Sequence, residues 1–266
     1  MKGIGAAALT PDALALLAPP AITVVLREVL GRSADVIDQV LPFDPRSFGA
    51  ERLGAKPHPL REEINRWSSL LGLPSVEIYT AARVPDLCAP VARSAVLVPA
   101  SAELNGAARF AVARAVLLAG LSLTLPVRLA GRDLALALGA LLRQFEPMYR
   151  PDGVDARELV ELAAKFTRTM PRDLHNEIAP FAEEVLQRGV KDAETIRAGA
   201  LELGDRVALL ATGDIAGGIA LLSPSGLDAI DAVESVAPVG RLVRVALSER
   251  FMEARRIAGA DLPSRQ

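Results

Sequence analysis

Beyond residue 100 the chain is a succession of apolar segments with helical spacing, and capping residues bound many of them. The expected helices cover 106–120, 131–145, 156–169, 172–188 with an interruption at Pro180, 192–212, 214–222, 225–235 and 248–258. The residues suited to cap them are Asn105, Asp155, Asp192, Asp214 and Ser248 at N-termini, and Gly189 and Gly213 at C-termini. This pattern predicts a mainly helical fold.

Two short segments before residue 100 have the character of strands. "SVEIYTAA" (75–82) and "SAVLVPA" (94–100) are rich in β-branched residues and are bounded by turn residues. Further helices are expected over 11–17, 20–31 and 60–71, whereas 43–58 suits a surface connection. The fold class predicted is therefore α+β, predominantly helical, with a small sheet of two to four strands.

Composition narrows the class of protein. Of the 266 residues, 51% are apolar and 23% are charged, which is enough to bury a sizeable core. The formal net charge is −2 and the basic residues are spread along the chain, so no nucleic-acid surface is expected. Cys88 is the only cysteine, which excludes an intrachain disulfide and favours a reducing, cytoplasmic compartment.

No integral membrane segment is expected. The start, MKGIGAAALTPDALALLAPP, is interrupted by Pro11 and Asp12, so it is not interpreted as a signal peptide. The most apolar run, 115–127, contains Pro126 and is shorter than the roughly 20 residues that a membrane helix needs. The positive mean hydropathy leaves contact with a membrane surface open.

The order of elements after residue 58 resembles a known peptidase core. "LPSVEIYTAARVPDLCAPVARSAVLVPASAEL" is similar to the beginning of the catalytic core of gluzincin-type zinc endopeptidases, which include HtpX-like and CAAX-prenyl peptidases. In that family a strand ends near an Asn-Ala-Phe-Ala motif, and a later helix carries His-Glu-x-x-His. The residues at the first motif here are Asp86, Leu87, Cys88 and Ala89, and the helix is "ARFAVARAVLLAG".

A later segment extends the resemblance. "GALELGDRVALLATGDIAGGIALL" (199–222) is similar to the family helix that carries the third zinc ligand, with Asp205 and Arg206 at its Asp-Arg pair. "VALSERFMEARRIAG" resembles the closing helix of many relatives. The resemblance implies a zincin-like core and a metallopeptidase-like domain over 58–266. Residues 1–57 match nothing in that core and are assigned to an N-terminal helical segment, a candidate linker from an upstream array.

The zinc ligands of the family are missing. The resemblance places Arg114, Ala115 and Leu118 where the family has its first histidine, its glutamate and its second histidine, and no shift of register helps because 106–123 contains no histidine. Leu201 stands at the third ligand, and Glu202, one residue further, is rotated about 100° around a helix. Zinc catalysis needs three ligands and a base. A pseudoenzyme with no metal and no cofactor is therefore predicted.

Asp205 is an acidic residue of the family pattern that this chain retains. In active relatives the equivalent carboxylate supports a zinc-bound histidine, as the resemblance implies. Without a metal a buried carboxylate needs another partner. We hypothesise that Arg114 reaches Asp205 and fills the vacated site. The alternatives are that Asp205 pairs with Arg206 or Arg109, or that it faces water.

The other candidate residues favour structural roles. His58, between prolines, suits a surface or capping position, and His175 does not share a helical face with its acidic neighbours. Cys88 lies beside Ala89 and Pro90 in an apolar loop and is expected to be a buried, unreactive thiol. "GDIAGG" (213–218) lacks the Gly-Lys-Ser/Thr ending of a phosphate-binding loop and is interpreted as a helix junction.

The expected function is that of a non-catalytic pseudo-metallopeptidase domain that binds a protein partner. The groove near residues 86–89, an edge strand beside a helix, could receive an extended peptide. The resemblance also implies that degenerate relatives occur as C-terminal modules of longer bacterial proteins. Two rivals remain, namely a helical scaffold unrelated to peptidases and a metal-independent enzyme. Absence of a strand at 94–100 beside helix 106–120 would favour the scaffold, and convergent polar side chains in a deep pocket would favour the enzyme.

Overall fold

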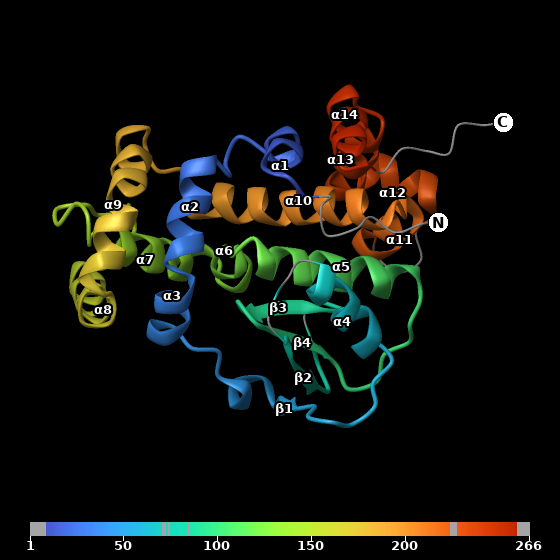
Figure 1. Ribbon diagram of the computed structural model, residues 1–266, viewed down its shortest axis with the longest axis horizontal. Coiled ribbons are helices and arrows are strands. Elements are labelled where there is room, and N and C mark those ends of the chain that lie inside the picture. Colours follow the sequence, from blue (N-terminus) through green and yellow to red (C-terminus); the bar gives the residue numbers. More distant parts are fainter. Residues whose placement is uncertain (1–8, 71–72, 74, 85, 224–227, 260–266) are drawn as a thin grey trace.

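The computed structural model describes residues 9–70, 73, 75–84, 86–223 and 228–259. Within these ranges the chain is predominantly helical and forms one small four-stranded mixed sheet, as predicted, whereas the zincin-like core stays a prediction (Figure 1). The helices are α1 Pro11–Leu17, α2 Val24–Arg32, α3 Ala34–Val40, α4 Arg61–Leu70, α5 Gly106–Gly120, α6 Thr124–Arg128, α7 Gly131–Leu142, α8 Ala156–Thr169, α9 Arg172–Gln187, α10 Ala193–Thr212, α11 Ile215–Leu222, α12 Ala229–Ser235, α13 Ala237–Ala246 and α14 Glu249–Ile257.

The sheet has the strand order β1-β2-β4-β3. Its strands are β1 Glu51–Arg52, β2 Glu77–Ala81, β3 Ala89–Ala92 and β4 Ala95–Pro99. The central pair β2 and β4 is parallel, and these are the two strands that the sequence predicts. The outer strands β1 and β3 pair antiparallel and were not predicted.

Strand β3 forms one edge of the sheet and is irregular. The register between β3 and β4 shifts between Pro90 and Ala92, and Pro90 has no N–H to donate. The carbonyl of Val91 accepts a hydrogen bond from the Arg128 guanidinium at 2.8 Å. A proline, a bulge and a basic side chain are devices that protect an edge strand from pairing with another chain.

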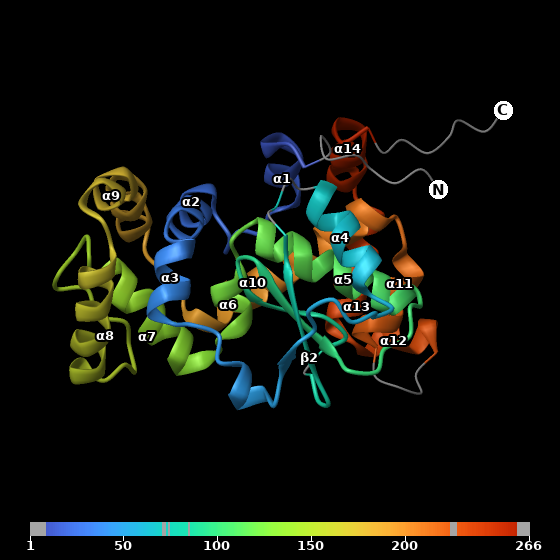
Figure 2. The ribbon, with the colours of Figure 1, turned by 60° about the horizontal axis from the view of Figure 1, so that its bottom comes forward.

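Helix α5 lies between α10 and the sheet (Figures 1 and 2). Its sequence, GAARFAVARAVLLAG, is made largely of small and aliphatic residues, and residue 108 together with 110–119 is buried. A helix that is apolar on all sides suits an interior position. The side chain oxygen of Asn105 accepts from the N–H of Ala108 and caps the helix, as predicted.

The predicted caps of the later helices are confirmed. The side chains of Asp155, Asp192, Asp214 and Ser248 each accept a backbone N–H in the first turn of the helix that follows. Gly189 and Gly213 have φ of 80° and 65°, the left-handed conformation that glycine adopts most easily. The interruption expected at Pro180 does not occur, because α9 runs through it.

Residues 9–57 contact several parts of the described chain that follows them. Helix α1 packs against α14, α2 against α9, and α3 against α8, while β1 pairs with β2. Apolar side chains of α1–α3 belong to the same buried cluster as those of α5 and α10. The boundary near residue 57 stays a prediction. None of the described helices is long and apolar enough to cross a membrane.

Candidate functional site

Arg114 joins three separate elements of the fold. It lies on α5 with 7% of its surface exposed, and its Nη1 donates to Asp205 Oδ1 on α10 at 3.0 Å. Its Nη2 pairs with Asp86 Oδ2 in the loop between β2 and β3. The predicted pairing of Arg114 with Asp205 is therefore confirmed, and Asp86 is a second partner that sequence reasoning did not assign. One guanidinium is therefore shared by two carboxylates.

The alternative partners of Asp205 are engaged elsewhere or exposed. Arg206 pairs with Glu202 one turn earlier on α10, and its Nη1 donates to the carbonyl of Leu17 at 2.7 Å. Arg109 is exposed on α5. Residues one apart on a helix point about 100° away from each other, which is why Arg206 and Asp205 serve different neighbours.

Burial is the main influence on the pKa of Asp205. Desolvation raises the pKa of this carboxyl group above its ordinary value, and the charge and hydrogen bond of Arg114 lower it by a smaller amount. The more distant charge of Arg241 also lowers this pKa. The carboxylate is therefore costly to keep ionised, and Arg114 is its main compensation.

The helices α5 and α10 touch beside this ion pair. A Cβ atom placed on Gly204 would lie 2.8 Å from Leu118 Cδ1 and 3.1 Å from Arg114 Cγ, both closer than ordinary packing permits. A side chain at position 204 would therefore press on Leu118 and Arg114, and glycine allows this close approach of α10 to α5. Ala115 is fully buried, whereas Leu201 and Glu202 are half-buried.

This arrangement does not fit a zinc ion. The positions that the resemblance assigns to zinc ligands hold a guanidinium and two isobutyl groups, from Arg114, Leu118 and Leu201, and none of these can donate a lone pair to a metal. Over the described ranges, no three or more His, Cys, Asp or Glu side chains form a group that could hold a metal ion.

The predicted groove residues 86–89 are largely engaged within the fold. Asp86 pairs with Arg114, and Leu87 packs against the core. Cys88 is buried as expected, and burial raises the pKa of its thiol well above the ordinary value. Ala89 begins strand β3. A peptide groove formed by these residues stays a prediction, and Cys88 itself faces the core.

The two histidines lie in different parts of the fold and each supports local structure. His58 Nδ1 accepts from the N–H of Leu60 at 3.2 Å, and its Nε2 lies 2.9 Å from the carbonyl of Pro99, so the ring caps the start of α4 as predicted. His175 stacks on Phe145, and its Nε2 lies 2.9 Å from the carbonyl of Gln144.

The segment 213–218 is the predicted helix junction. Asp214 Oδ1 accepts from the N–H of Gly217 at 2.8 Å and caps α11. Gly217 lies against the start of α5, since an added Cβ would lie 2.6 Å from the carbonyl oxygen of Gly106.

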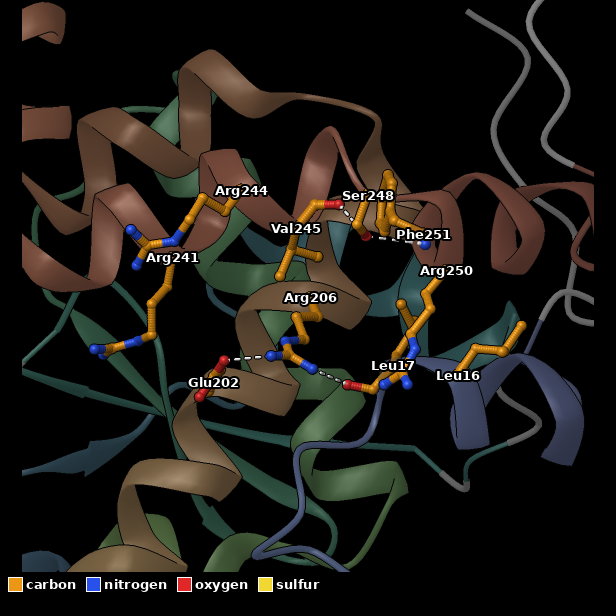
Figure 3. Close-up of a pocket in the computed structure, with 10 residues that line it drawn as sticks. All are labelled: Leu16, Leu17, Glu202, Arg206, Arg241, Arg244, Val245, Ser248, Arg250 and Phe251. Carbon is orange, nitrogen blue, oxygen red and sulfur yellow. Dashed lines mark hydrogen bonds and ion pairs between the residues drawn. The ribbon is translucent and has the colours of Figure 1, made fainter.

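A second group of charged residues was missed by the sequence analysis. A pocket of about 320 Å³ lies between α1, α10, α13 and α14 (Figure 3). Its charged lining consists of Arg206, Arg241, Arg244, Arg250 and Glu202. Two of these arginines belong to α13, a helix that the sequence analysis did not predict. The i, i+3 spacing of Arg241 and Arg244 was the available signal.

Comparisons of this chain with family models, with curated proteins and with solved structures found no match.

Proposed function

We propose that this chain is a non-catalytic, metallopeptidase-like domain that binds a protein partner. The observation that carries the proposal is the guanidinium of Arg114, which bridges Asp86 and Asp205 in a buried position. The resemblance places Arg114 at the first zinc ligand and Asp205 at the acid that supports a zinc-bound histidine in active relatives. A fixed organic cation then takes the position of a metal cation.

The bridge connects the same elements that the zinc site would connect. In the resembling family the metal links the His-Glu-x-x-His helix to the third-ligand helix, near the loop that follows the first strand. Here α5, α10 and the loop between β2 and β3 meet at Arg114. This correspondence supports a structural centre derived from a catalytic one.

The packing around the bridge supports the absence of peptidase chemistry. Hydrolysis by zinc requires an open coordination position for water between the ligand helices. The contact of Gly204 with Leu118 and Arg114 brings α5 and α10 together at that point. This close approach of the two helices supports a site in which side chains take the place of a metal and its water.

The structure of strand β3 disfavours one way of binding a partner, namely the addition of a peptide strand to this edge of the sheet. Addition of a peptide strand needs free backbone N–H and carbonyl groups along an edge. The irregular register near Pro90 and the bond from Arg128 to the Val91 carbonyl interrupt that edge. We therefore infer that a partner contacts side chains of the surface and does not extend the sheet at β3.

The first experiment tests zinc binding and peptidase activity. The purified protein is incubated with zinc chloride, dialysed and analysed for metal, and its cleavage of unfolded casein is measured with and without a chelator. We expect no stoichiometric zinc and no chelator-sensitive cleavage. A zinc-dependent peptidase activity of the wild type would contradict the proposal.

A rebuilt site tests the correspondence of positions. The triple variant Arg114→His/Leu118→His/Leu201→Glu places three ligands where the resemblance expects them, and Arg114→His alone is the matched control with one ligand. We expect the triple variant to bind one zinc per chain and the control to bind none. A triple variant that has the wild-type circular dichroism spectrum and binds no zinc would contradict the metallopeptidase-like framework.

Partner binding is tested by affinity purification with mass spectrometry, followed by titration of the recovered protein against the purified chain. A direct interaction with a measurable Kd supports the proposed role. If no protein binds the purified chain, the proposed partner-binding role is contradicted, and the alternative of a helical scaffold unrelated to peptidases is favoured.

A further inference from the structure

We propose that the pocket between α1, α10, α13 and α14 binds a small phosphorylated organic molecule. This site goes beyond the proposed partner binding and lies apart from the guanidinium of Arg114. A volume of about 320 Å³ is within the range of small-molecule pockets. The argument rests on the charge, the partners and the apolar wall of this pocket.

The lining has a strong positive charge in a chain that is slightly negative as a whole. Four arginines face one glutamate, Glu202, so that the lining carries a formal charge of +3, whereas the whole chain carries −2. The arginines come from different helices: Arg206 from α10, Arg241 and Arg244 from α13, and Arg250 from α14. Arg244 and Arg250 are exposed and Arg241 is half-buried, so water solvates part of this charge, and an anion that enters the pocket is attracted by all of these groups.

Three of these arginines lack a carboxylate partner. Across the described part of the chain, Arg241, Arg244 and Arg250 have no Asp or Glu oxygen within ion-pair distance, although many other arginines form such pairs. Arg241 and Arg244 lie three residues apart and therefore share one face of α13. Their guanidinium groups can donate to the same oxyanion.

Arg206 is held in position at the floor of the pocket. Its two terminal nitrogens are fixed by Glu202 and by the carbonyl of Leu17. Its Nε is buried and has no hydrogen-bond partner among the described residues. Figure 3 shows this guanidinium between Glu202 and Leu17, with Arg241 and Arg244 on one side and Arg250 on the other. An arginine fixed by its neighbours loses little entropy when a ligand arrives.

The apolar side chains of the pocket indicate which class of anion it would bind. Leu16, Leu17, Val245 and Phe251 line the pocket beside the arginines, so that an apolar group could pack against them. Guanidinium groups match the oxygen geometry of a phosphate and donate to it in pairs. A phosphate monoester carries close to two negative charges near neutral pH, which suits an excess of three positive charges better than a single carboxylate does. In an organic phosphate monoester, the phosphate would contact the arginines and the organic group would pack against the apolar side chains.

The test is isothermal titration of the purified chain with phenyl phosphate at low salt, with benzyl alcohol as the uncharged control. The pocket variant is Arg241→Gln/Arg244→Gln, and the matched variant Arg46→Gln/Arg168→Gln removes the same charge from two exposed positions elsewhere. We expect phenyl phosphate to bind the wild type and benzyl alcohol not to bind. The pocket variant should bind at least about tenfold more weakly, because one lost charge-assisted hydrogen bond corresponds to roughly that factor. The matched variant should bind like the wild type.

A second arm separates a soluble phosphate from a lipid-borne one. Cosedimentation is measured with phosphatidylcholine vesicles that contain or lack phosphatidic acid, whose headgroup is a phosphate monoester. Binding in either arm that is lost in the pocket variant and kept in the matched variant supports the site, and the arm that responds identifies the source. Absence of binding in both arms, or equal weakening in the two variants, overturns the proposal.

Discussion

Replacement of Arg114 by methionine tests the central ion pair. Arg114→Met keeps much of the aliphatic volume on α5 and removes the charge, so that Asp205 remains buried without its principal partner. The side chains of Arg114 and Asp205 are only 8% and 12% exposed, and solvent therefore screens the pair weakly. Asp86 is more exposed, at 29%, and is better able to be hydrated.

The expected loss is large relative to the stability of a domain. Removal of one partner of a buried ion pair costs about 3–5 kcal/mol, because the other charge is left uncompensated. Domains are stable by about 5–15 kcal/mol in total. Asp205→Asn should cost less, about 1–3 kcal/mol, because Arg114 retains Asp86. The double variant leaves no charge at either position, and it should lose less than the sum of the two single losses.

The loss should also depend on pH in a defined direction. The folded pKa of Asp205 is raised above its ordinary value of 3.8, so the folded state binds more protons than the unfolded state between these two values. The contribution of Asp205 to stability is therefore present below the ordinary pKa and is lost as pH rises through the folded pKa. Arg114→Met raises this pKa further, since Arg114 lowers it. The variant should consequently lose less stability at pH 5 than at pH 7.

Urea denaturation measures these free energies. Trp67 is the only tryptophan, it is 4% exposed, and its fluorescence together with circular dichroism can follow unfolding. The four proteins of the cycle are measured at both pH values. A loss below about 1 kcal/mol for Arg114→Met, which is typical of exposed pairs, would refute the argument. A loss that is the same at pH 5 and pH 7 would refute the assigned role of Asp205.

Three further predictions concern packing and reactivity. Gly204→Ala should destabilise the protein by about 1–3 kcal/mol, because its Cβ would press on Leu118. Gly31→Ala on α2 should stabilise it by roughly 0.5–1 kcal/mol, because the added Cβ meets only the Cβ of Ser122, at the ordinary contact distance of 4.0 Å. Thermal unfolding compares the two variants. Native Cys88 should resist iodoacetamide and react after unfolding, as mass spectrometry would record; rapid native labelling would show that the thiol is accessible. Arg128→Met should cost about 1–3 kcal/mol in urea denaturation, because two carbonyl groups lose their donor; an unchanged midpoint would contradict this role.

Local signals in the sequence were sufficient for the elements that build the ion-pair centre. The bounds of α5 and α8 were predicted to the residue, because Asn105 and Asp155 are strong N-caps. The parallel strands β2 and β4 followed from their β-branched residues. The pairing of Arg114 with Asp205 was predicted from the resemblance, which places both residues at one former metal site, together with the need of a buried carboxylate for a partner.

Two of the missed elements, β3 and α13, contain residues that usually interrupt regular structure. Strand β3 contains Pro90, which an irregular edge strand tolerates. Helix α13 contains Pro238 and Gly240. Proline at the first positions of a helix needs no N–H donor, and Gly240 lies against the carbonyl of Val233, where a Cβ would be only 2.9 Å away. Tertiary contacts explain these residues, and no single-sequence pattern contains those contacts.

Long-range neighbours limited the prediction of the site. Asp86 was assigned to a groove, and its pairing with Arg114 depends on the path of the loop between β2 and β3. The arginine pocket forms only where α1, α13 and α14 meet at α10. This packing places Leu16 and Arg250, which are far apart in the sequence, on the same pocket. The i, i+3 spacing of Arg241 and Arg244 was not recognised in the sequence, and only the fold brings the other two arginines beside them.

The bridge through Arg114 has a consequence for how the molecule responds to its surroundings. A metal ion is an independent component, which dilution, starvation or a chelator can remove from a protein. The guanidinium of Arg114 is part of the polypeptide and cannot be removed from the folded protein in this way. The junction of α5, α10 and the loop before β3 is therefore complete as soon as the chain folds, and acid is the chemical means of neutralising its two carboxylates.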